Sequence, residues 1–197
     1  MNVFVLNSGR CGSTTFIRAC RHIRNYSAGH ETRVQLLGEQ RLAYPPNHIE
    51  ADNRLCWFLG RLDAAYGEHA YYVHLSRDPG ATAASFAQRS RFGIMRAYRE
   101  GLLLHDQPQA SDLALAKDYL RTVEANIALF LRGKPQQMAF RLERAKQDFR
   151  LFWDWIGAEG EQAAALAEWD TAHNAGLPAA AAQAGPSTPG HEPKDVT

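Results

Sequence analysis

The chain has 197 residues, of which 45% are hydrophobic and 22% charged, and its formal net charge is +1. This length suits one domain with a sizeable core, or one domain followed by a tail. A net charge so close to zero provides no overall basic field, so we expect no nucleic-acid partner.

The cysteines and the first residues indicate the compartment. Cys11, Cys20 and Cys56 match no metal-ligand spacing, so they are expected to be free thiols in a reducing compartment, and we expect no required metal. The chain does not start with a basic segment followed by an apolar one, and no apolar run reaches about eighteen residues. We therefore expect a cytoplasmic protein that does not enter a membrane.

Three apolar runs predict strands, and helical patterns separate them. Residues 3–6 and 70–76 read as buried strands and residues 137–142 as a weaker one. The sheet is therefore either small or contains further strands, for which residues 25–47 are the expected place. Helical spacing covers a segment after residue 13, residues 51–67, residues 112–132 and residues 148–157, where Gly157 is expected to end the helix.

Alternating strands and helices predict an α/β domain with a small, mainly parallel sheet flanked by helices. We expect this domain to cover residues 1–176. Residues 177–197 are rich in Ala, Pro and Gly and contain no aromatic residue, so they are expected to form a disordered tail.

The segment NSGRCGSTTF (residues 7–16) joins the first strand to the first helix and has the composition of an anion-binding loop. Gly9 and Gly12 allow a tight backbone curl, Ser13 and Thr14 supply hydroxyls at a helix N-terminus, and Arg10 adds a positive charge. A plain strand-to-helix turn capped by Ser or Thr is the alternative. The triphosphate-binding pattern G-x-x-x-x-G-K-S/T is absent, and no acidic strand end for magnesium is evident, which disfavours ATP or GTP hydrolysis.

SGRCGSTTF resembles the 5′-phosphosulfate-binding loop of sulfotransferases that use 3′-phosphoadenosine 5′-phosphosulfate (PAPS), in its carbohydrate-type version. The resemblance implies a P-loop-like sulfotransferase architecture. It also implies transfer of a sulfuryl group to a hydroxyl-bearing carbohydrate or other small molecule, with release of 3′,5′-adenosine bisphosphate (PAP). The implied cofactor-binding residues of this loop are Ser8, Gly9, Arg10, Cys11, Gly12, Ser13 and Thr14.

A second segment, YYVHLSRDPGATAASF, matches the element of that family that grips the 3′-phosphate. There an arginine ends a central strand and a serine follows eight residues later, as Arg77 and Ser85 do here. A planar guanidinium at a strand end is suited to bidentate phosphate binding. The alternative is an ordinary turn in which Arg77 and Asp78 form a surface ion pair.

Sulfuryl transfer needs a cation for charge on the leaving phosphate and a base for the acceptor hydroxyl. Arg10 is the candidate cation and acts electrostatically, because a guanidinium does not lose its proton. For the base, the family resemblance favours Glu31 in SAGHETR, and His48 in YPPNHIEADN is the rival. His30 is a further candidate that orients Glu31 or a ligand, and a solvated loop position is the alternative for both Glu31 and His48.

Other readings stay open at this point. One is a small-molecule or nucleotide kinase with a degenerate phosphate loop, and another is a catalytically silent nucleotide-binding or partner-binding module. The basic segment QRSRFGIMRAYR, with Arg89, Arg91, Arg96 and Arg99, is either a solvated helix face or a site for a phosphate or an anionic acceptor. His173 and Asn174 are candidates for closing over the nucleotide. The acceptor and the oligomeric state cannot be read from the sequence.

Overall fold

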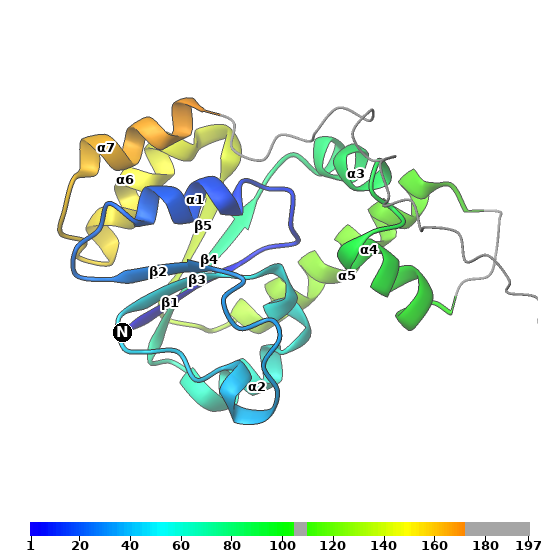
Figure 1. Ribbon diagram of the computed structural model, residues 1–197, viewed down its shortest axis with the longest axis horizontal. Coiled ribbons are helices and arrows are strands. Elements are labelled where there is room, and N and C mark those ends of the chain that lie inside the picture. Colours follow the sequence, from blue (N-terminus) through cyan, green and yellow to red (C-terminus); the bar gives the residue numbers. More distant parts are fainter. Residues whose placement is uncertain (105–109, 172–197) are drawn as a thin grey trace, which may run out of the picture.

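The computed structural model describes residues 1–104 and 110–171 (Figure 1). The expected boundary at residue 176, the proposed tail, and the candidates His173 and Asn174 lie outside the described residues. In the described part of the chain, no helix is long and apolar enough to cross a membrane.

The core of the fold is a parallel sheet of five strands in the order β2-β3-β1-β4-β5. The strands are β1 (Asn2–Leu6), β2 (Ser27–His30), β3 (His48–Ala51), β4 (Ala70–Ser76) and β5 (Gln137–Arg141). The α/β class with a parallel sheet is therefore confirmed. All five residues of the central strand β1 are buried, which explains its continuous apolar run.

Three strands lie where the apolar runs predict them, and β2 is the strand expected between residues 25 and 47. Residues 48–51, where the sequence analysis predicted no strand, form β3. His48 and Glu50 interrupt the apolar pattern of β3, yet both side chains are buried. Strands whose polar residues are internally paired give no apolar signal in the sequence.

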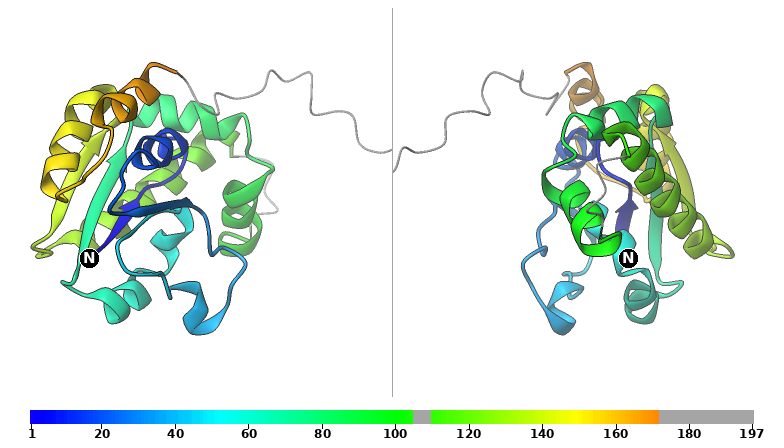
Figure 2. Two further views of the ribbon diagram at one scale, coloured as in Figure 1. Left: turned by 60° about the vertical axis from the view of Figure 1, so that its left-hand side comes forward. Right: turned by 90° about the vertical axis from the view of Figure 1, so that its right-hand side faces the viewer.

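Helices cover both faces of the sheet (Figures 1 and 2). One face carries α1, α6 and α7, and the other carries α2 and α5, while α3 and α4 lie beside α5 beyond the strand ends. The helices are α1 (Ser13–Cys20), α2 (Leu59–Tyr66), α3 (Pro79–Ala87), α4 (Gly93–Ala97), α5 (Asp112–Leu131), α6 (Ala145–Trp155) and α7 (Gln162–Ala167). Short helical turns are η1 (Gly38–Arg41), η2 (Asn53–Trp57), η3 (Tyr98–Leu102), η4 (Leu142–Arg144) and η5 (Glu168–Asp170).

The helix expected over residues 51–67 is broken into η2 and α2, so that prediction was only partly correct. Asp52 caps η2 by accepting a hydrogen bond from the Arg54 backbone N–H at 2.8 Å. The predictions of α5 and of a helix end at Gly157 are confirmed, because Gly157 follows α6 with φ 63°.

The topology determines where a ligand can bind. After β1 the chain builds β2 and β3 on one side, and after β4 it builds β5 on the other side. The carboxyl ends of β1 and β4 therefore form the point where the strand order reverses. Open parallel sheets bind their ligands in the crevice at this point.

Candidate active site

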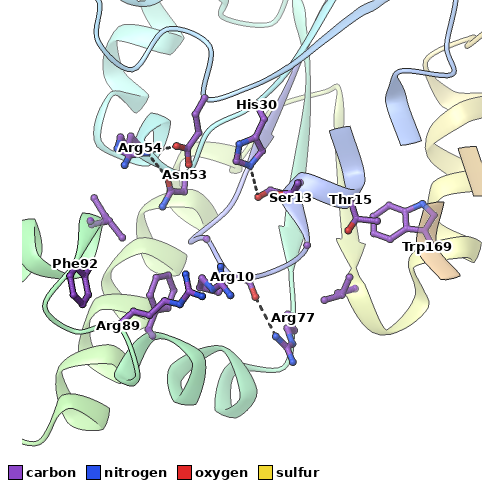
Figure 3. Close-up of a pocket in the computed structure, with 18 of the residues that line it drawn as sticks. Arg10, Ser13, Thr15, His30, Asn53, Arg54, Arg77, Arg89, Phe92 and Trp169 are labelled. Atoms are coloured by element: carbon purple, nitrogen blue, oxygen red, sulfur yellow. Dashed lines mark hydrogen bonds and ion pairs between the residues drawn. The ribbon is translucent and has the colours of Figure 1, made fainter. Parts of the chain in front are cut away.

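A cavity of about 690 Å³ opens at the carboxyl ends of the strands (Figure 3). This volume lies within the range of small-molecule sites. Its walls come from the loop after β1, the end of β2, η2, Arg77 after β4, the segment from α3 to α4, and the C-terminal turn η5. Segments far apart in the sequence therefore meet at the point where the strand order of the sheet reverses.

The loop between β1 and α1 adopts a strained, tightly curled backbone. Gly9 and Gly12 have φ values of 93° and 91°, and Arg10, a residue with a side chain, has φ 58°. A Cβ at Gly12 would lie 2.7 Å from Leu142 Cδ1, so alanine there would have to displace the end of that side chain in addition to straining the backbone. Asn7, which the sequence analysis did not single out, accepts a hydrogen bond from the Gly9 N–H at 3.0 Å and holds the curl.

The predicted loop residues divide into two groups. Gly9, Arg10, Gly12, Ser13 and Thr14 line the cavity. Ser8 and Cys11 are buried beneath the loop, where the Ser8 carbonyl accepts a hydrogen bond from Tyr119 and the Cys11 thiol contacts Asn7. Burial raises the pKa of the Cys11 thiol to about 12, so this thiol is inert, and neither of these two side chains faces a ligand.

The loop arginine connects the two predicted anion sites. Arg10 Nε donates a hydrogen bond to Ser85 Oγ at 3.1 Å, and Arg77 Nη1 donates one to the Arg10 carbonyl at 3.4 Å. Arg77 lines the cavity, and Ser85 stands beside it through its bond to Arg10. The structure thus brings Arg10, Arg77 and Ser85 together beyond the carboxyl ends of β1 and β4.

Positive charge accumulates at this point. Burial lowers the pKa of Arg10, and the charges of Arg89 and Arg77 lower it further. Asp78 and Arg77 form no ion pair, and the Asp78 carboxylate instead caps α3 by accepting a hydrogen bond from the Ala81 N–H at 2.7 Å. An anion bound between Arg10 and Arg77 would relieve the repulsion between these two guanidinium groups.

Glu31 lies at the cavity wall directly after β2. Its backbone N–H donates to the Ala51 carbonyl at 3.0 Å, and its φ of 55° turns the side chain toward the cavity. Arg54 Nη1 lies 2.8 Å from Glu31 Oε2, with both side chains about one-third exposed (35% and 33%). This ion pair fixes the carboxylate at the edge of the cavity (Figure 3).

A buried carboxylate holds the turn that carries Glu31. Glu50 is fully buried and accepts hydrogen bonds from the Thr32 N–H at 2.7 Å and from the Thr32 hydroxyl at 2.8 Å. His48 Nε2 lies 2.9 Å from Glu50 Oε2, and its other ring nitrogen lies 2.8 Å from Ser27 Oγ. His48 therefore belongs to the support of this turn, and it is not among the residues that line the cavity.

His30 is the histidine that the structure brings to the cavity. It ends β2, and its Nε2 lies 3.0 Å from the hydroxyl of Ser13, the first residue of α1. It stands directly before Glu31, so the strand end delivers a histidine and a carboxylate to the same wall.

Replacing Gly29 with alanine is expected to destabilise this turn. A Cβ there would lie 2.3 Å from Thr32 Cγ2 and 2.9 Å from Glu50 Oε2. Overpacking of this kind costs roughly 1–3 kcal/mol, which a lower midpoint of thermal unfolding would report. Gly60→Ala in α2 is the matched control, because no atom lies within 4 Å of its added Cβ and it should stabilise the helix slightly. Equal stability of the two variants would contradict the close packing at Gly29.

The C-terminal turn completes the other end of the cavity. Glu168 lies 3.1 Å from His22 after α1, and Trp169 lines the cavity while packing against the rings of Phe16 and Phe140. The Trp169 indole N–H is buried and has no hydrogen-bond partner among the described residues. The sequence analysis did not assign Trp169 to the site, because this residue belongs to no recognisable motif.

One sequence-based argument about magnesium needs correction. Asp52 directly follows β3, so an acidic strand end is present after all. Its carboxylate is fully buried in an ion pair with Arg41 and is not part of the cavity lining. Within residues 1–104 and 110–171, no group of three or more His, Cys, Asp or Glu side chains is arranged to hold a metal ion.

Comparison with solved structures assigns the fold. The sulfotransferase domain from the curacin biosynthetic pathway aligns with a TM-score of 0.57 and 15% identity over 89% of this chain and 80% of that domain. Mouse sulfotransferase SULT7A1, solved in complex with PAP, aligns with a TM-score of 0.51 and 13% identity over 86% of this chain and 63% of the mouse chain. This chain thus spans less than two thirds of the mouse enzyme. No family model and no curated protein sequence matches it. The similarity shows that the chain has the sulfotransferase fold.

Proposed function

We propose that the protein is a sulfotransferase that moves the sulfuryl group of PAPS to the hydroxyl group of an acceptor. The observation that carries this proposal is the meeting of the glycine loop, Arg10 and Arg77 at the carboxyl ends of β1 and β4. One cavity there offers two anion-binding elements, and PAPS has two anionic ends. The sulfotransferase fold of the chain supports the same assignment.

The loop after β1 suits the 5′-phosphosulfate. Backbone N–H groups at the N-terminus of α1 and the hydroxyls of Ser13 and Thr14 provide donors beside a helix dipole that favours negative charge. Ser8 and Cys11 would contribute through their backbone alone. Arg77 and Ser85 are the proposed ligands of the 3′-phosphate, because Arg77 lines the cavity and both residues contact Arg10.

Transfer forms a bond between the acceptor oxygen and sulfur and breaks the bond between sulfur and the 5′-phosphate oxygen, which leaves PAP. Glu31 is the proposed base that takes the proton from the acceptor hydroxyl, since its carboxylate stands at the cavity wall. Arg10 is the proposed electrostatic stabiliser of the charge that develops on the leaving phosphate. His30 is proposed to orient the Ser13 hydroxyl, which would lie next to the phosphosulfate.

Calorimetric titration with PAP and, separately, with ATP and magnesium tests the proposal against a kinase. Tight PAP binding and weak ATP binding are expected, because the cavity has arginines for a 3′-phosphate while Asp52 is tied to Arg41 and the loop has no lysine. Preference for ATP with magnesium would refute the sulfotransferase proposal. Tight PAP binding without sulfation of any member of a broad acceptor panel would instead favour a silent nucleotide-binding module.

The proposed acceptor is a small molecule or a carbohydrate that reaches Glu31 from the open side of the cavity. Cys11, Cys20 and Cys56 are buried free thiols, which fits the proposed reducing, cytoplasmic compartment.

A further inference from the structure

The cavity has two chemically different ends (Figure 3). Trp169 and Thr15 lie at one end, and Arg89, Phe92, Asn53 and Arg54 lie at the other, with Arg10 between them. If the protein is the proposed sulfotransferase, the end that contains Glu31 and Arg54 is the acceptor end. The charged and apolar side chains of its walls then indicate the chemical class of the acceptor.

The acceptor end carries an uncompensated positive charge. Arg54 is paired with Glu31, so these two charges offset each other. Arg89 is half-buried in the wall, and its guanidinium forms no hydrogen bond or ion pair with any described residue. The charge of Arg89 also lowers the pKa of the nearby Arg10. A half-buried guanidinium without a partner is costly, and an oxyanion would satisfy it.

The position of Arg89 separates it from the proposed 3′-phosphate site. Arg77 precedes the nine-residue helix α3 and Arg89 follows it, so they stand at opposite ends of that helix. A helix of this length spans roughly 13 Å. Arg77 therefore remains at the nucleotide side, while Arg89 lies beside Arg10 on the side of Phe92 (Figure 3).

Apolar side chains stand beside Arg89. Phe92 lines the cavity although 69% of its surface is exposed, and Phe86 and Ile94 line the same wall. An exposed aromatic ring at a cavity mouth is suited to cover the apolar body of a ligand.

We propose that the acceptor is an anionic alcohol or phenol. Its hydroxyl faces Glu31, its apolar body lies against Phe92, and its carboxylate or another oxyanion pairs with Arg89. This proposal deepens the proposed function and rests on it. It distinguishes the acceptor from a neutral sugar, which would leave Arg89 unpaired.

Binding to the PAP-saturated protein tests the proposal. The probes are 3-(4-hydroxyphenyl)propanoate and its uncharged amide, which differ only in the anionic group. Calorimetry should show the carboxylate binding about 10–100-fold more tightly than the amide, in keeping with a charge-assisted hydrogen bond. Arg89→Gln should abolish that preference and leave PAP affinity unchanged. Arg91→Gln is the control, because Arg91 is exposed and does not line the cavity.

Three results would overturn the proposal: equal binding of the two probes to the natural protein, no binding of either, or a marked loss of PAP affinity in Arg89→Gln. The last result would place Arg89 on the 3′-phosphate. Failure of the proposed function would appear differently, as absent PAP binding or absent sulfation. The carboxylate preference is measured by binding to the PAP-saturated protein, so it does not depend on transfer.

Discussion

Glu31→Gln is expected to lower the rate of sulfuryl transfer by roughly 10²-fold or more, while the affinity for PAP stays unchanged. The amide keeps the size of the side chain and one oxygen for Arg54, so the turn after β2 should persist. It cannot accept the proton of an acceptor hydroxyl. Turnover measured with saturating PAPS, together with calorimetric titration of PAP, separates the loss of a base from the loss of a binding site.

Glu39→Gln is a suitable control for this experiment. Glu39 is an exposed carboxylate in η1, so its replacement changes the net charge equally and should leave turnover intact. Near-normal turnover of Glu31→Gln would eliminate Glu31 as the base. His30 would then be the next candidate, because it lines the cavity and His48 does not.

The central strands of this fold can be predicted from the sequence because each of them is marked by a local run of apolar residues. Residues of β1 and β4 are buried on both faces of the sheet, which requires a nearly continuous apolar run. β3 cannot be predicted in this way, because two of its buried side chains are polar. They are paired with groups on β2 and in the turn after it. Such pairing appears only when the strands are placed side by side.

The difference between local sequence patterns and contacts between distant segments also explains which site residues the sequence predicts. The loop after β1 and the pair Arg77 and Ser85 are short motifs, so their residues are recognisable from spacing alone. The direction of each loop side chain is a property of the curled backbone, and this is why Ser8 and Cys11 were grouped with residues that face the cavity. Arg89 was one of four similar arginines in the sequence, and only the structure distinguishes it from Arg91.

Arg10→Gly is expected to separate stability from function. The guanidinium stands between the two anion sites, so its loss should lower turnover by about 10²–10³-fold and also weaken PAP binding. The backbone of Arg10, however, has φ 58°, a left-handed conformation that costs residues with a Cβ about 1–2 kcal/mol. Glycine adopts this conformation without that cost.

Arg10→Ala completes the comparison, because alanine loses the guanidinium and keeps the strained backbone. Both variants should lose turnover equally, and Arg10→Gly should be the more stable by about 1 kcal/mol in chemical denaturation. Equal stability would mean that the loop relaxes without strain, and full activity of either variant would remove Arg10 from the mechanism. In the proposed mechanism, the strained backbone of Arg10 places a positive charge where negative charge develops on the leaving phosphate. The curl that Gly9 and Gly12 permit is what directs that charge into the cavity.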